Sequence, residues 1–130
     1  MNLNNLPVGI TDWSEVTVSV HPGESGTATT RTRQLGDIQI RLVDYSTDYI
    51  ADHWCHKGHI VFVVAGQLTI EHQHGVSYTL TQGTSYHVAD DDGPPHRVLS
   101  KNGATIFIVD RPFLQTGDEH IGHVEIDPRP

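Results

Sequence analysis

The fold of this chain is decided by residues 52–68, which read DHWCHKGHIVFVVAGQL. The second half of this stretch is a run of mostly β-branched residues at positions 60–65, followed by Gly66. Because β-branched residues favour strands and glycine favours turns, the run predicts a short buried strand that ends at Gly66. The first half holds three histidines and the only cysteine of the chain. Such a density of potential metal ligands points to a site beside the strand.

Short segments of alternating polar and apolar residues flank this run on both sides. Together with the run itself they predict strands at residues 15–20, 27–35, 38–43, 60–65, 67–72, 76–80, 84–88, 97–100 and 104–109. Turn residues separate many of these segments, which is typical of an all-β sandwich or barrel. Asn102-Gly103 favours a tight hairpin between the last two strands. Residues 120–126 are a further candidate strand.

The chain has 130 residues, 16 of them acidic and 8 basic, and a formal net charge of −8. The length suits a single domain over residues 1–130, with irregular extensions at both ends. The negative charge disfavours nucleic acid and anionic membrane surfaces as partners. No basic and apolar leader and no long apolar run is present, and a single cysteine excludes an intrachain disulfide. We therefore expect a cytoplasmic protein.

Four side chains form the candidate metal site. If residues 53–55 are extended, His53 and Cys55 share one face, because residues two apart in a strand point the same way. Gly58 allows a bend before His59, which opens the next strand. His96 follows a Gly-Pro-Pro turn more than thirty residues later. A barrel that brings these two regions together would supply the metal ligands His53, Cys55, His59 and His96.

The other histidines have simpler interpretations. Isolated histidines are usually exposed or hydrogen-bonded, and we expect this of His21, His72, His74, His120 and His123. His56 is expected to point away from the site, and His87 is left open as a pocket residue. Cys55 could also be a small buried apolar residue. The acidic residues 90–92 are expected to form a solvated loop.

These residues resemble the two sequence motifs of the cupin superfamily. In the first motif, two histidines one residue apart precede a glutamate and a later glycine. Counting back from Gly66, these ligand positions fall on His53, Cys55 and His59. The second motif ends in a histidine, which falls on His96. The resemblance covers about residues 35–110, which would be the barrel core.

Residues 52–55, followed by Lys57 and Gly58, also resemble a small subgroup of bacterial cupins with a nearby Asp, His, Cys and Trp. The resemblance implies a double-stranded β-helix, also called a jelly-roll barrel, and a homodimer. The chain departs from the usual three histidines and one glutamate, and it lacks the usual proline at Asp91 and the usual asparagine at Ser100.

One thiolate and three imidazoles suit a divalent transition metal, with zinc, iron or nickel favoured and copper also compatible. A tetrahedral site using all four ligands would be closed and structural, whereas a larger coordination number would leave open positions. Beside the metal we expect pocket residues, and the candidates are Lys57, Phe62, Tyr78, Tyr86, His87 and Phe107.

Three functions follow from such a site. The first is a metal-dependent enzyme acting on a small organic molecule, with a dioxygenase as the leading class because the resemblance favours it. A metal-dependent isomerase or lyase is the next class. The second function is a non-catalytic module that binds or senses a metal or small ligand. The third is a purely structural metal site.

Overall fold

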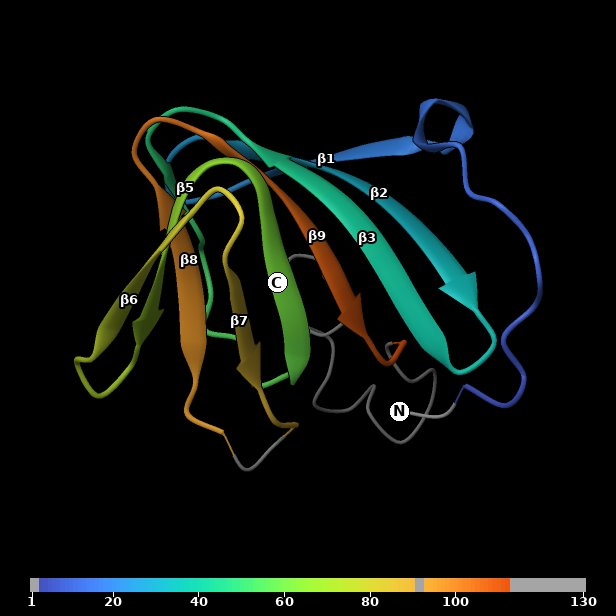
Figure 1. Ribbon diagram of the computed structural model, residues 1–130. Helices are drawn as coiled ribbons and strands as arrows, with labels where there is room; N and C mark the ends of the chain where they lie inside the picture. The colour runs from blue at the N-terminus through green and yellow to red at the C-terminus, as the bar shows by residue number, and fades with distance from the viewer. Residues whose placement is uncertain (1–2, 91–92, 113–130) are drawn as a thin grey trace.

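The structure is a computed structural model, and it describes residues 3–90 and 93–112. The described residues form nine strands and one 3-10 turn, Trp13–Glu15 (Figure 1). The prediction of an all-β fold is confirmed. Within these residues, no helix has the length and apolar character needed to cross a membrane.

Strand β5 (His59–His72) joins two antiparallel sheets. Its first half lies in sheet A, which has the order β1-β2-β3-β9-β5-β7. The other strands of sheet A are β1 (Val18–Pro22), β2 (Thr27–Leu35), β3 (Ile38–Tyr45), β7 (Ser85–Val88) and β9 (Ala104–Asp110). The second half of β5 lies in sheet B, together with β4 (Tyr49–Ile50), β6 (Ser77–Thr81) and β8 (His96–Ser100). The sheets curl toward each other as a barrel (Figure 1).

The bend in β5 lies at Gly66. A register shift between Val63 and Ala65 marks a bulge, and Gly66 follows with a φ of 81°. A Cβ at Gly66 would collide with the carbonyl oxygen of Gly103, so only glycine fits there. The prediction of two strands, 60–65 and 67–72, was wrong. A bulge followed by glycine bends a strand without ending its hydrogen bonding.

The neighbours of β5 turn at the same place. Along one edge of β5, β9 pairs with its first half and β8 with its second half. Along the other edge, β7 pairs with the first half and β6 with the second half. Gly103 and Gly83, with φ values of 91° and 88°, lie in the turns between these strands. The predicted 102–103 hairpin was wrong, because β8 and β9 do not pair with each other in the described part of the chain. We call the line through Gly66, Gly83 and Gly103 the crease.

Most other strands match their predicted positions, and β2 has the predicted bounds. The sequence missed β4, because two residues are too short to show an alternation. The predicted strand at 120–126 lies outside the described residues.

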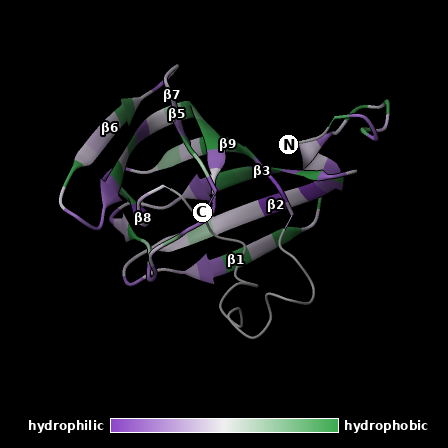
Figure 2. Ribbon diagram, turned by 90° about the horizontal axis from the view of Figure 1, so that it is seen from below, coloured by the Kyte–Doolittle hydropathy of each residue, from purple (hydrophilic) through white to green (hydrophobic). Residues whose placement is uncertain are grey.

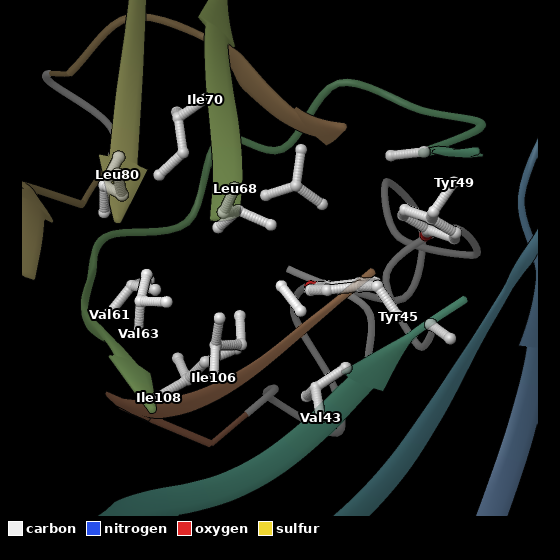
Figure 3. Packing of buried hydrophobic residues seen from close by; sticks show 14 residues of the cluster. Val43, Tyr45, Tyr49, Val61, Val63, Leu68, Ile70, Leu80, Ile106 and Ile108 are labelled. Carbon is white, nitrogen blue, oxygen red and sulfur yellow. The ribbon is translucent and has the colours of Figure 1, made fainter. Parts of the chain in front are cut away.

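An apolar core fills the barrel next to the crease. Figure 3 shows side chains of both sheets meeting there, among them Val61, Val63, Leu68, Ile70 and Ile106. Hydrophobic and hydrophilic segments alternate along several strands (Figure 2), as expected when one face of a sheet is buried. Away from the crease, the buried residues become polar. We call this region the open end, and it contains both ends of β5.

Candidate functional site

The open end is built from the residues of β3, β5, β8 and β9 that lie farthest from the crease. Their side chains belong to the inward-facing series on each strand, so they are buried although they are polar. These buried polar residues are Gln39, Arg41, His59, His72, His96 and Asp110, and Lys57 lies just before β5.

Asp110 is the centre of one half of this region. Its Oδ2 accepts a hydrogen bond from Arg41 Nη2 at 2.7 Å, and its Oδ1 accepts one from Gln39 Nε2 at 3.1 Å. Lys57 Nζ lies 3.7 Å from Oδ1, and His59 Nδ1 lies 3.6 Å from Oδ2. Burial alone would raise the pKa of Asp110. The nearby His59, Arg41 and Lys57 outweigh burial and lower it, so the carboxylate stays ionised.

His59 and His96 form the other half, and their Nε2 atoms lie 3.0 Å apart. His96 Nδ1 lies 3.1 Å from the carbonyl oxygen of Pro94, which can only accept, so Nδ1 carries the proton. His59 Nδ1 lies 3.6 Å from Asp110 Oδ2, too far for a hydrogen bond, although the negative charge favours a proton on that nitrogen. With the proton on Nδ1 in both rings, the two Nε2 atoms carry lone pairs that converge; with the His59 proton on Nε2, the two rings share a hydrogen bond.

Burial keeps both imidazoles neutral. It lowers the pKa of His59, and burial together with the nearby His59 lowers the pKa of His96 to about 4. Two nitrogen ligands at right angles, each about 2.1 Å from one metal ion, would lie about 3.0 Å apart. The spacing of the two Nε2 atoms therefore fits a pair of metal ligands.

Cys55 lies beside this pair. Its backbone exchanges two hydrogen bonds with His96, of 2.7 and 3.0 Å, in an isolated bridge. Directly opposed residues of an antiparallel pair project to the same side, so the thiol lies on the side of the His96 ring. The Cys55 Sγ accepts a contact from the Lys57 backbone N–H at 3.4 Å. Burial raises the pKa of Cys55.

His53 is half-buried, and its Nδ1 lies 2.9 Å from Asp52 Oδ1. The strand expected at residues 53–55 was wrong: residues 51–58 are irregular apart from the Cys55 bridge, because the chain crosses here between the sheets. Alternation therefore does not place His53 and Cys55 on one face. Among residues 3–90 and 93–112, no group of three or more His, Cys, Asp or Glu side chains is arranged to hold a metal ion. The four-ligand centre remains a prediction.

An aromatic group borders the histidine pair. His72, which is opposite His96 in the β5–β8 register, has its Nε2 2.7 Å from the Tyr86 hydroxyl. The Tyr86 ring lies 6.1 Å from the His96 ring, and Tyr78 packs against both His72 and Tyr86. Burial raises the pKa of Tyr86 to about 12, so its hydroxyl remains a donor.

An open pocket of about 330 Å³ reaches this end of the barrel from outside. His59 and Asp110 belong to its lining. Asp90 organises the rim, because it accepts from the Gly58 N–H at 2.7 Å and from Arg111 Nε at 3.0 Å. A Cβ at Gly58 would collide with the backbone of residues 89–90, so this close approach requires glycine.

The remaining pocket candidates take different positions. Lys57 is buried beside Asp110, and burial lowers the pKa of Lys57 to about 8. His87 is exposed on β7 and belongs to the pocket lining. Phe62 and Phe107 are register partners on the outward faces of β5 and β9, where Trp13 packs against Phe107.

Sequence reasoning missed Gln39, Arg41 and Asp110. The alternation at residues 38–43 was visible, but alternation does not say which face is buried. In the structure Gln39 and Arg41 point inward, and Ile40 and Leu42 lie on the other face. The available signal for a buried polar site was the position of Asp110, a charged residue at the end of an apolar strand.

No protein-family model and no curated protein sequence matches the chain. Solved structures do match. A sugar phosphate isomerase of the cupin superfamily from Silicibacter pomeroyi is 16% identical with a TM-score of 0.64, over 80% of this chain and 76% of that one. An RmlC-like cupin from Shewanella frigidimarina is 14% identical with a TM-score of 0.62, over 88% of this chain and 98% of that one. FeII HppE is 16% identical with a TM-score of 0.65, over 79% of this chain and 60% of that one. The curled sheets, the crease and these matches together show that the chain has the jelly-roll barrel fold of the cupins.

Proposed function

We propose that this chain is a metal-dependent cupin protein that acts on a small organic molecule at the open end of its barrel. The observation that carries the proposal is the pair of Nε2 atoms of His59 and His96, 3.0 Å apart. Two lone pairs at this distance repel each other unless a proton or a cation lies between them. Pro94 and Asp110 favour a proton on the other nitrogen of each ring, which supports a cation.

The proposed ligands are His59 and His96, with Cys55 and His53 completing the set. Cys55 is supported by its backbone bridge to His96. Binding a metal would require Cys55 to lose its proton, and a thiolate with imidazoles suits zinc, iron or nickel. The similar HppE structure is an FeII form, and we extend iron to this chain only as a candidate.

A bound metal would act as a Lewis acid or redox centre for a ligand at an open position. The residues of the chain have separate tasks around it. Asp110 and Pro94 orient the two imidazoles through their Nδ1 atoms. Tyr86 and His72 form an aromatic wall beside His96, and the pocket next to His59 is the proposed route of entry. We propose an oxygenase as the leading reaction class and an isomerase or lyase as the next.

Elemental analysis of the purified protein tests the proposal, with the variants His59→Ala, His96→Ala and Cys55→Ala. We expect one transition-metal ion per chain and loss of most of it in both histidine variants. The matched control is His87→Ala, because His87 is exposed and lies outside the pair. Full metal content in both histidine variants would reject the site.

Non-catalytic binding is the competing function. The observation that favours it is burial, because His96 is only 1% exposed and Arg41 is fully buried, so a substrate has little direct access to them. Metal-dependent stabilisation without turnover on a panel of small substrates would support this alternative.

A further inference from the structure

We propose that Asp90 is a positioning residue, which fixes the segment that carries Cys55 and His59 against the end of β9. The proposed function makes these two side chains metal ligands, and the inference rests on it for that role. Asp90 itself is not proposed as a ligand, because its two carboxylate oxygens are bound to Gly58 and Arg111.

The first observation is that the segment before β5 lacks regular structure. Residues 51–58 are irregular apart from the bridge between Cys55 and His96. Strand pairing with β7 begins at His59, whose register partner is Val88. A single bridge constrains only the residues beside it. A further contact between Cys55 and His59 therefore determines how these two side chains lie relative to each other.

The second observation is a hydrogen bond from the backbone of Gly58 to the side chain of Asp90. The Gly58 N–H donates to Asp90 Oδ1 at 2.7 Å. Gly58 is buried, and a buried N–H without an acceptor costs free energy. A Cβ at Gly58 would collide with the backbone of residues 89–90, so the two segments are in close contact. Asp90 therefore continues the attachment of β7 beyond the register pair at His59 and Val88.

The third observation is that the other oxygen of Asp90 contacts the end of β9. Asp90 Oδ2 accepts from Arg111 Nε at 3.0 Å, and Arg111 directly follows Asp110. The side chains of Asp90 and Arg111 are 40% and 37% exposed, so their ion pair should contribute less than the bond to the buried Gly58 N–H. One carboxylate thus connects the start of β5 with the end of β9, where His59 and Asp110 meet.

Binding of Co²⁺ to Asp90→Ala protein tests the inference. We expect the affinity to fall by about tenfold or more, as is typical when a group that orients metal ligands is removed. The visible absorption of the bound cobalt should also change, because it reports the geometry of the ligands. Asp44→Ala is the matched control: Asp44 also pairs with an arginine and accepts from Thr105 Oγ1 at 2.6 Å, but it lies on the outward face of β3. Equal cobalt affinity and spectra in the wild-type and Asp90→Ala proteins would overturn the inference.

Two conservative variants separate position from charge. In Asp90→Asn an amide oxygen can still accept from the Gly58 N–H, whereas the negative charge is lost, so most of the cobalt affinity should be retained. Asp90→Glu keeps the charge but moves the oxygens, so it should lose affinity; it replaces Asp90→Ala if circular dichroism shows that the alanine variant is unfolded. An Asp90→Asn protein as weak as Asp90→Ala would show that Asp90 acts through its charge or as a ligand, and would overturn the inference.

NMR spectroscopy of the metal-free protein separates this inference from the proposed function. Asp90→Ala should speed hydrogen exchange of the Gly58 amide and shift the side-chain signals of Cys55 and His59, whereas those of His21 on β1 should stay. Such shifts in a protein that binds no transition metal would support the positioning by Asp90 and reject the proposed function alone. Unchanged signals of Cys55 and His59 in folded Asp90→Ala protein would overturn the inference, whether or not a metal binds.

Discussion

The two ends of the barrel interior are built by the same strands and differ almost completely in chemistry. On β9, Ile106 and Ile108 lie toward the crease and Asp110 lies at the open end. On β5, Val61 and Val63 follow His59 in the same inward series. One end gains stability from close apolar packing, and the other end buries charges that cost stability unless they are paired. The apolar residues that stabilise the fold and the polar residues of the candidate site therefore lie on separate lengths of the same strands.

Asp110→Ala should have the largest effect. It leaves Arg41 and Lys57 buried without their carboxylate, and breaking a buried ion pair costs about 4 kcal/mol. Urea denaturation measures the loss. Glu24→Ala is the control, because the Glu24 side chain is exposed and pairs with Arg97 at 3.6 Å, so we expect a loss below about 1 kcal/mol. Similar losses in both variants would show that the buried ion pairs of Asp110 contribute no more to stability than an exposed pair does.

Leu68→Ala tests the apolar end alone. Leu68 is fully buried in the core beside the crease, and its truncation should cost about 3 kcal/mol through lost burial and a cavity. Metal content should not change at temperatures where the variant is folded. Val76→Ala, at an exposed position, should cost little. Loss of metal from folded Leu68→Ala protein would show that the two ends are coupled.

Acid should destabilise the metal-free protein through the open end. The unfolded chain protonates His96 near pH 6.5, whereas the folded chain does so only near pH 4. The unfolded state therefore binds more protons between these values, and stability falls as pH falls through this window. From His96 alone we expect a loss of about 2 kcal/mol between pH 7 and pH 5. Denaturation of His96→Asn should show a smaller pH dependence, and an unchanged one would contradict the assignment; His87→Asn is the control.

Tyr86→Phe should have the smallest effect. It removes the hydroxyl that lies 2.7 Å from His72 Nε2 and keeps the ring in the aromatic group. Loss of one such hydrogen bond costs about 1 kcal/mol. Tyr78→Phe is a matched control on the same group, because Tyr78 is 47% exposed and should tolerate the change. If Tyr78→Phe is the more damaging variant, the His72–Tyr86 contact does not stabilise the open end.

The strands and the barrel class could be predicted from the sequence because alternation and turn residues are local signals. The continuity of β5 could not, since a glycine that ends a strand and a glycine that bends one look alike in sequence. The inward placement of Gln39 and Arg41 was also hidden, because their pairing with Asp110 joins residues about seventy positions apart. For the site, His59 and His96 were predicted as partners and their rings do meet. The strand argument for placing His53 and Cys55 on one face does not hold, because residues 51–58 are irregular apart from the Cys55 bridge, and their joint role as ligands stays a prediction.

The single bent strand β5 also has a consequence for folding. Its two ends, His59 and His72, reach the same end of the barrel only when the crease has formed and β8 and β9 have paired along its edge. Asp110 ends the last described strand, and its partners come from the third and fifth. Such distant contacts form slowly, because the entropic cost of closing long loops comes before the contacts stabilise the fold. Assembly of the site is therefore a late event in folding, and a nascent chain that stops before β9 lacks its central carboxylate.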